Sequence, residues 1–92
     1  MPQIQLELPE VLRPLADGAA VLPVQADTVS AALAELGRRH PLLLSRVLTR
    51  GGALRPHVNL FLNQQDLRLS RGLETPVRDG DRLAVVAAVS GG

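Results

Sequence analysis

The chain of 92 residues has no cysteine and no lysine, and Phe61 is its single aromatic residue. The absence of cysteine excludes disulfides, thiolate nucleophiles and cysteine-based metal sites. Without lysine, the Met1 amine is the only amine in the chain that could accept an acyl group. Because aromatic residues are nearly absent, the core must be built from leucine, valine, isoleucine and alanine.

Charge is balanced, with ten arginines against nine acidic residues and a net charge of +1. No basic stripe with an aromatic platform stands out, so we expect no nucleic-acid partner. No apolar run approaches the roughly 20 residues that a membrane-spanning helix requires. The first ten residues alternate polar with apolar and carry acid, unlike a signal peptide. We therefore expect a cytoplasmic protein with no membrane contact.

The length and the 46% hydrophobic fraction are typical of one small globular domain. Residues 3–8 alternate strictly between polar and apolar, which predicts a strand. Residues 10–19 are rich in turn formers and are expected to form a loop. Residues 20–25 resume an extended pattern, and Pro23 within them lacks a backbone donor. This second strand should therefore lie at an edge of the sheet.

After residue 26, the spacing of apolar residues changes to that of a helix. Asp27-Thr28 is a good N-cap pair, and apolar residues follow at helical spacing over 29–36. Gly37 and the two arginines after it suit the C-terminal end of this helix. Residues 42–49 are interpreted as a second, short helical segment.

The C-terminal half returns to strands. Residues 57–62 alternate and predict a strand, with a turn at 63–66 and a short strand at 67–69. Asp-Gly-Asp at 79–81 predicts a tight turn. Residues 82–89 form a continuous apolar run, typical of a buried central strand.

This order of elements favours one fold class. A helix that follows a hairpin makes a crossover, so the last strand can pair in parallel with the first. The sequence therefore predicts an α+β, β-grasp (ubiquitin-like) fold, a mixed sheet of four to five strands with one main helix on one face. We expect residues 1–89 to form this domain and residues 90–92 to form a flexible tail.

The chain ends in Ser90-Gly91-Gly92. A tail without side chains can thread a narrow channel in a partner, where a Cβ atom would clash. The carboxylate at the end of such a tail is a poor acylating group. A partner enzyme could use ATP to convert it to an acyl-adenylate, which has a good leaving group. Sulfide can then displace the nucleotide and leave a thiocarboxylate. This chemistry requires no catalytic side chain on the chain that bears the tail.

Three segments, 12–14, 57–68 and 77–92, resemble the ubiquitin-like sulfur carriers. These carriers include the small subunit of molybdopterin synthase, the thiazole sulfur carrier, and the carriers of cysteine or siderophore biosynthesis. The Val-Asn-x-aromatic piece at 58–61 and the turn at 79–81 look most like the cysteine-pathway carrier. The Gly-Gly end is common to the whole group.

The resemblance implies a protein co-substrate and not an enzyme. An E1-like adenylating enzyme would use ATP to activate the Gly92 carboxylate, and a sulfur-accepting synthase would receive the sulfur. Gly91 and Ser90 would thread into the partner. No cofactor would be bound to the carrier itself.

Alternatives remain open. The molybdopterin synthase subunit commonly has Pro-Pro-Val before its tail, where this chain has Ala87-Ala88-Val89. That departure disfavours the role of molybdopterin synthase small subunit, which stays the first alternative. A ubiquitin-like protein modifier and a plain β-grasp interaction domain are the others.

A docking face is predicted on the side of the sheet away from the helix. Its expected members are Phe61, Leu69, Val86 and Ala88, although Phe61 packed under a loop is the structural alternative. His40 and His57 have no companion at metal-ligand spacing, so no metal site is expected.

Overall fold

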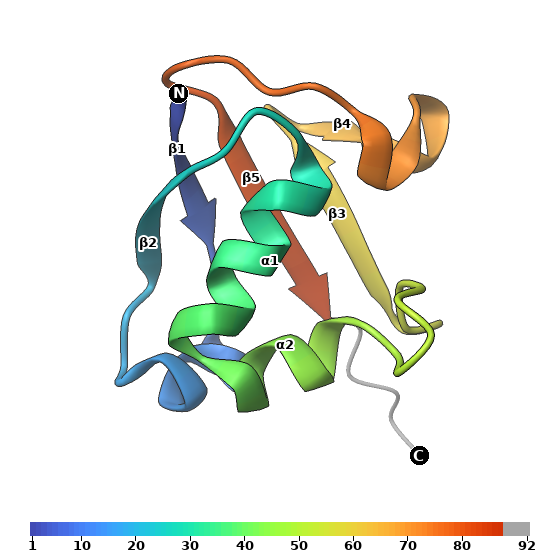
Figure 1. The fold of residues 1–92 in the computed structure, drawn as a ribbon. Coiled ribbons are helices and arrows are strands. Elements are labelled where there is room, and N and C mark those ends of the chain that lie inside the picture. Colours follow the sequence, from blue (N-terminus) through green and yellow to red (C-terminus); the bar gives the residue numbers. More distant parts are fainter. Residues whose placement is uncertain (88–92) are drawn as a thin grey trace.

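The computed structural model describes residues 1–87, so the predicted tail and the predicted boundary after residue 89 lie outside the described residues. A five-stranded sheet in the order β2-β1-β5-β3-β4 is crossed on one face by α1 (Figure 1). The strands are β1 (Gln3–Glu7), β2 (Val21–Gln25), β3 (Val58–Leu62), β4 (Gln65–Asp66) and β5 (Arg82–Ala87), and the helices are α1 (Val29–Arg39), α2 (Pro41–Val47) and the 3₁₀ helices η1 (Glu10–Ala16), η2 (Leu67–Leu69) and η3 (Gly72–Glu74). None of the helices in this part of the chain has the length and apolar character needed to span a membrane.

The strand pairing confirms the predicted β-grasp fold. The first and last strands run in parallel, with Leu6 opposite Leu83. The hairpin partner β2 and the later strand β3 are antiparallel to β1 and β5, respectively. This leaves β5 in the middle of the sheet, as its continuous apolar run predicts, and puts β2 with Pro23 at the edge.

The core lies between α1 and one face of the sheet, and it is aliphatic. Ile4 and Leu6 alternate inward from β1, and both are fully buried. The apolar stripe of α1 faces them, with Leu33 and Leu36 also buried. One aliphatic layer thus holds the helix on the sheet, because burial of each such side chain contributes about 1.5–3 kcal/mol.

The N-cap prediction for α1 is confirmed. The Thr28 hydroxyl accepts a hydrogen bond of 3.1 Å from the amide of Ala31. Gly37, however, lies inside the helix and not past its end. A Cβ atom at Gly37 would clash with Cδ2 of Leu44 in α2, so the missing side chain permits a close approach of the two helices.

Two predictions of local structure were wrong. Residues 10–16 form η1 and not a loop, because Leu12 and Ala16 turn inward and are buried. The short strand after β3 lies at residues 65–66, inside the predicted turn, and residues 67–69 form η2 and not a strand. The Asp66 side chain accepts a hydrogen bond from the amide of Arg68, which turns the chain after only two residues of β4.

Candidate functional site

The last described residue of β5 defines where the chain leaves the sheet. Ala87 lies opposite Val58, the first residue of β3, and His57 directly precedes it. This is the end of the sheet at which α2 and η1 lie (Figure 1). Ser90, Gly91 and Gly92, the predicted sulfur-carrying tail, lie beyond it, outside the described residues.

The face of the sheet opposite α1 carries an apolar centre. Phe61 pairs with Ala84 in the register of β3 and β5, and Asn59 pairs with Val86. Phe61, Ala84 and Val86 line a hollow of about 480 Å³, and Val86 is 44% exposed. The prediction that Phe61 points away from the helix is therefore confirmed, and we call this hollow with its lining the open face.

Polar groups border the open face at the start of β5. Nη2 of Arg82 lies 2.6 Å from Oε2 of Glu7, and both residues line the hollow. The amide of Arg82 donates to the Asn63 side chain at 2.9 Å, and that side chain donates to Asp81 at 2.9 Å. These contacts fix a polar rim beside an apolar centre, which is the usual composition of a protein contact surface.

The structure brings together only part of the predicted docking set. Phe61 and Val86 line one hollow, whereas Leu69, 79% exposed on η2, is not among the described residues that line it. Ala88 lies outside the described residues. Whether any of these residues contacts a partner stays a prediction.

Five lining residues were missing from the predicted docking set: Glu7, Asn63, Gln64, Arg82 and Ala84. Alternation in residues 3–8 already turns Glu7 outward, but only the parallel register of β1 and β5 brings it to Ala84. Asn63 and Gln64 adopt positive φ angles of 49° and 74° in the two-residue turn between β3 and β4. That turn carries them to the border of the hollow.

The described residues contain no group of three or more His, Cys, Asp or Glu arranged to hold a metal. Shifted carboxyl pKa values occur at two surface ion pairs. The Arg38 guanidinium, hydrogen-bonded to Glu35, lowers the pKa of that carboxyl, and Arg68 does the same for Asp66. Neither carboxylate lines the open face, so these shifts belong to structural pairs.

Comparisons with known proteins cover nearly the whole chain. The ThiS family matches residues 6–92. Sulfur carrier protein CysO of Mycobacterium tuberculosis is 31% identical over 91 residues, which cover 97% of this chain and 98% of that protein. A chain of the Amycolatopsis orientalis BexX/CysO complex superposes with a TM-score of 0.88 at 31% identity, covering 97% of this chain and 99% of the other.

The small archaeal modifier protein 1 from Methanosarcina acetivorans is also similar. Its solution structure superposes with a TM-score of 0.89 at 28% identity, covering 100% of this chain and 98% of that one. The family match and the similarity to this modifier both include β5 and the segment that follows it.

Proposed function

The chain belongs to the ThiS family, and we propose on that basis that it is a sulfur carrier protein of the CysO type, with sulfur carried on Gly92. The observation that carries this proposal is the alignment with CysO over nearly the full length of both proteins. The family match also extends through Gly92.

The proposed reaction uses the chain as a co-substrate. An E1-like enzyme joins a carboxylate oxygen of Gly92 to the α-phosphate of ATP, and pyrophosphate leaves. Hydrosulfide sulfur then forms a bond to the carbonyl carbon, the carbon–oxygen bond to the phosphate breaks, and AMP leaves. The resulting thiocarboxylate donates its sulfur to a synthase that makes cysteine or a related sulfur metabolite.

The described residues contribute recognition to this reaction. Phe61 and Val86 supply an apolar centre on the open face, and Glu7 with Arg82 supplies an ion-paired rim. A partner that covers this centre removes apolar surface from water, which favours association by roughly 25 cal/mol per Å². Gly91 has no side chain and Ser90 a small one, so this segment fits a narrow channel.

Intact mass measurement tests the proposal. The purified protein is incubated with ATP, sulfide and the adenylating enzyme of the same organism, beside a variant that lacks Gly92. We expect a mass gain equal to replacement of one oxygen by sulfur, and no gain in the variant. An unchanged mass, with an enzyme that is active on another carrier, would overturn the proposal.

A protein modifier is the second candidate, favoured by the similarity to small archaeal modifier protein 1. In that function, Gly92 would form an isopeptide bond with a lysine of a target protein. The chain has no lysine, so self-conjugation through a lysine side chain is excluded. Antibody detection of an N-terminally tagged chain separates the two functions, because only a modifier gives covalent species of higher mass that need Gly92.

A further inference from the structure

Charge is divided unevenly along the chain. Residues 36–65 contain no Asp or Glu and five arginines: Arg38, Arg39, Arg46, Arg50 and Arg55. The rest of the chain holds all nine acidic residues against the other five arginines. The near-neutral total therefore conceals a basic segment, which runs from the end of α1 through α2 and β3 to the start of β4, with all of its arginines before β3.

Two hollows flank α2 within this basic segment. One, of about 310 Å³, is lined by Leu15, Leu42, Ser45, Arg46, Arg55 and His57. The other includes Arg50. Ser45 and Arg55 line both, so the hollows adjoin at Arg55. We call Leu42, Arg46, Arg50 and Arg55 the α2 surface.

Among residues 1–87, no carboxylate pairs with the arginines of the α2 surface. Each ion pair among residues 1–87 involves another arginine: Arg38 and Arg39 with Glu35, Arg68 with Asp66, and Arg82 with Glu7. Nε of Arg55 donates a hydrogen bond of 2.8 Å to the Ser45 carbonyl, which holds this guanidinium in place.

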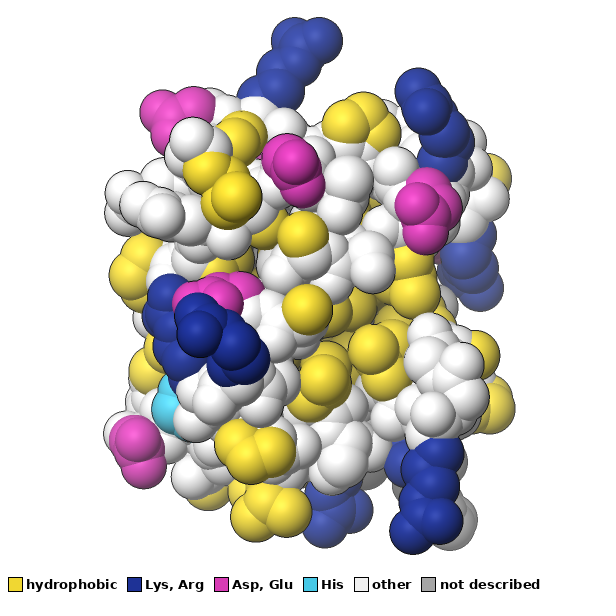
Figure 2. Space-filling view, in the orientation of Figure 1, with side chains coloured by type: hydrophobic (Ala, Val, Ile, Leu, Met, Phe, Trp, Pro, Cys, Tyr) yellow, Lys and Arg dark blue, Asp and Glu magenta, His cyan; other side chains and the backbone are white. Residues whose placement is uncertain are grey.

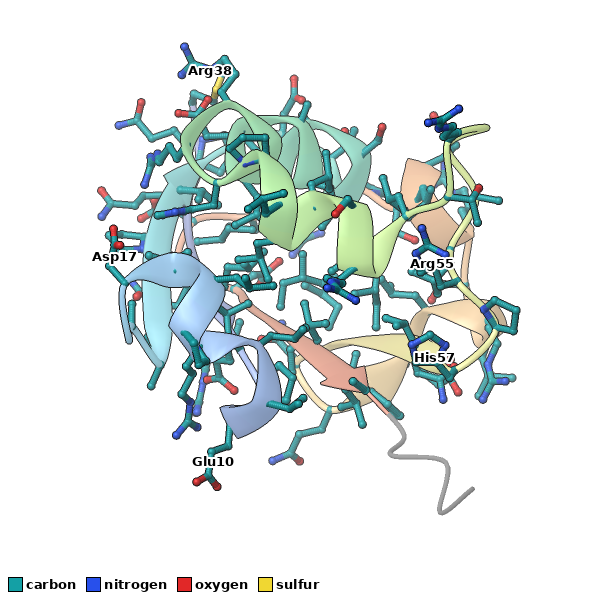
Figure 3. The ribbon with its side chains drawn as sticks, turned by 90° about the horizontal axis from the view of Figure 1, so that it is seen from below. Glu10, Asp17, Arg38, Arg55 and His57 are labelled. Atoms are coloured by element: carbon teal, nitrogen blue, oxygen red, sulfur yellow. The ribbon has the colours of Figure 1, made fainter. Side chains whose placement is uncertain are left out.

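The views of the molecule agree with this separation of charge. Figure 3 shows Arg55 and His57 together on one side, away from Glu10 and Asp17 on the η1 side. In Figure 2, the lower right part of the face shows blue and yellow side chains and no magenta ones among the described residues.

The α2 surface adjoins the point where the chain leaves the sheet. His57 lines the same hollow as Arg46 and Arg55, and its neighbour Val58 lies opposite Ala87. Residues 88–92 span at most about 18 Å when fully extended. A protein that receives Gly92 in a channel must therefore come close to this surface.

We propose that the α2 surface docks against an acidic surface of the adenylating enzyme beside the entrance for the tail; this inference rests on the proposed function. Arginines bind carboxylates with paired, charge-assisted hydrogen bonds, and three arginines that have no carboxylate partner among residues 1–87 complement clustered Asp and Glu. Leu42, which is 68% exposed, adds apolar contact area. The surface has no aromatic side chain for bases to stack on, which favours a protein over a nucleic acid.

The test compares two charge-reversed variants of equal net charge. Arg46→Glu/Arg50→Glu alters the α2 surface without breaking the Arg55–Ser45 contact. Arg71→Glu/Arg78→Glu makes the same change at two exposed arginines outside both hollows. The dissociation constant for the adenylating enzyme and its salt dependence are measured for both variants, with thermal unfolding as a check on folding.

We expect the α2 variant to bind roughly tenfold more weakly and with a flatter salt dependence, while the control stays within about twofold of wild type. Equal binding by both variants, with normal thiocarboxylate formation by wild type, overturns this inference alone. If wild type is not activated at all, the proposed function fails, and this inference fails with it. Retention of a single-stranded oligonucleotide that is lost in the α2 variant, with enzyme binding unchanged, would instead assign the surface to nucleic acid.

Discussion

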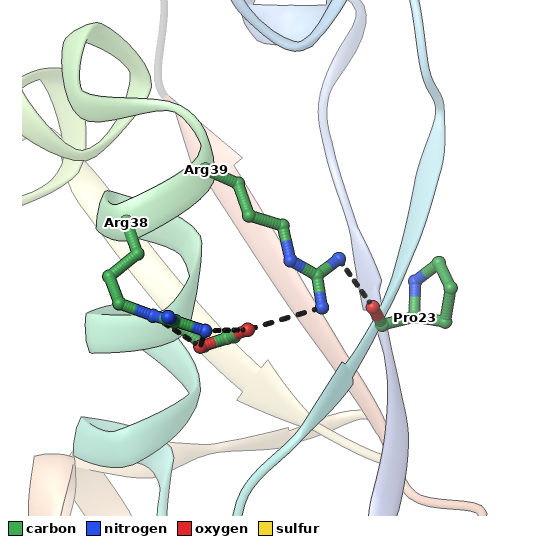
Figure 4. A network of polar contacts seen from close by, with 4 residues as sticks. Pro23, Arg38 and Arg39 are labelled. Carbon is green, nitrogen blue, oxygen red and sulfur yellow. Dashed lines mark hydrogen bonds and ion pairs between the residues drawn. The ribbon is translucent and has the colours of Figure 1, made fainter.

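The guanidinium of Arg39, the last residue of α1, donates a hydrogen bond of 2.9 Å to the carbonyl oxygen of Pro23 on β2 (Figure 4). At the two ends of the β1–β2 pairing, the amide of Leu8 donates to the carbonyl of Ala20 and the amide of Ala26 donates to the carbonyl of Pro2. Hydrogen-bonded pairs alternate with non-bonded pairs along an antiparallel ladder, so Gln5 and Pro23 form a non-bonded pair. The backbone groups of Pro23 therefore point away from β1. The outer edge at this position therefore has neither a free donor nor a free acceptor.

A free backbone donor and a free backbone acceptor at position 23 should promote association of two molecules through β2. In Pro23→Val/Arg39→Ala, the edge gains an amide donor and an unoccupied carbonyl, next to the exposed Val21. We expect the variant to form dimers or larger species as its concentration rises, detected by light scattering after size exclusion. Arg39→Ala alone should lower the free energy of unfolding by about 0.5–1 kcal/mol.

Pro23→Val alone is the matched control, because Arg39 still occupies the carbonyl. It should associate less than the double variant. A double variant with the molecular mass of wild type at every concentration would show that these two residues do not protect the edge.

The contact between Gly37 and Leu44 predicts a coupling of the two helices. Alanine is favoured over glycine by about 1 kcal/mol in a helix, but its Cβ atom would clash with Cδ2 of Leu44. We therefore expect Gly37→Ala to raise the free energy of unfolding by about 1 kcal/mol in a Leu44→Ala background and by less in wild type.

Urea unfolding of the four proteins of this double-mutant cycle measures the coupling. An equal effect of Gly37→Ala in both backgrounds would mean that Leu44 turns aside at no cost. The close packing of α1 on α2 would then not explain the glycine.

Patterns that are local in the sequence were sufficient for most of the fold. The alternation in residues 3–8, the helical stripe after Thr28 and the apolar run from Arg82 each predicted the correct element. Pro23 was correctly assigned to an edge because a missing donor constrains a strand wherever it lies. The β-grasp order followed from these elements alone.

Features that depend on tertiary contacts were missed. The turn formers in residues 10–19 concealed η1, which is held by the burial of Leu12 and Ala16 against the core. Glu7 and Arg82 form an ion pair because of the register in which β1 pairs with β5. The spacing of residues within either strand does not predict that register. The sequence therefore predicted two apolar members of the open face, Phe61 and Val86, but it did not predict the polar rim.

The pair of Glu35 with Arg38 makes stability depend on pH. The Arg38 hydrogen bonds lower the pKa of Glu35 from 4.5 in the folded protein. The folded state therefore binds fewer protons than the unfolded state in acid. The stabilisation by this ion pair is complete above pH 4.5 and is lost as the pH falls through the lower pKa that Glu35 has in the folded state.

Glu35→Gln removes this contribution. We expect the difference in free energy of unfolding between wild type and variant to be largest near neutral pH and to shrink below about pH 4. Glu74→Gln, at a carboxylate outside the ion pairs of the described residues, serves as the control in the same urea titrations. A difference that stays constant down to acid pH would contradict the assignment.

The open face should dominate binding to the adenylating enzyme if its apolar centre is the contact. Phe61→Ala removes the largest side chain of the hollow, and we expect the dissociation constant to rise roughly tenfold or more. Val86→Ala removes two methyl groups from the same hollow and should weaken binding by a few-fold. Val11→Ala is the matched control, since Val11 is 59% exposed on η1 and does not line the hollow.

Titration calorimetry gives these constants, and thermal unfolding separates a lost contact from a lost fold. Because Phe61 is half-buried, its variant is interpreted only beside Val86→Ala, where the altered side chain is already 44% exposed. Leu69→Ala then measures whether the contact extends to η2. If both Phe61→Ala and Val86→Ala bind like wild type, recognition does not use the open face, and binding must depend on the tail and the α2 surface.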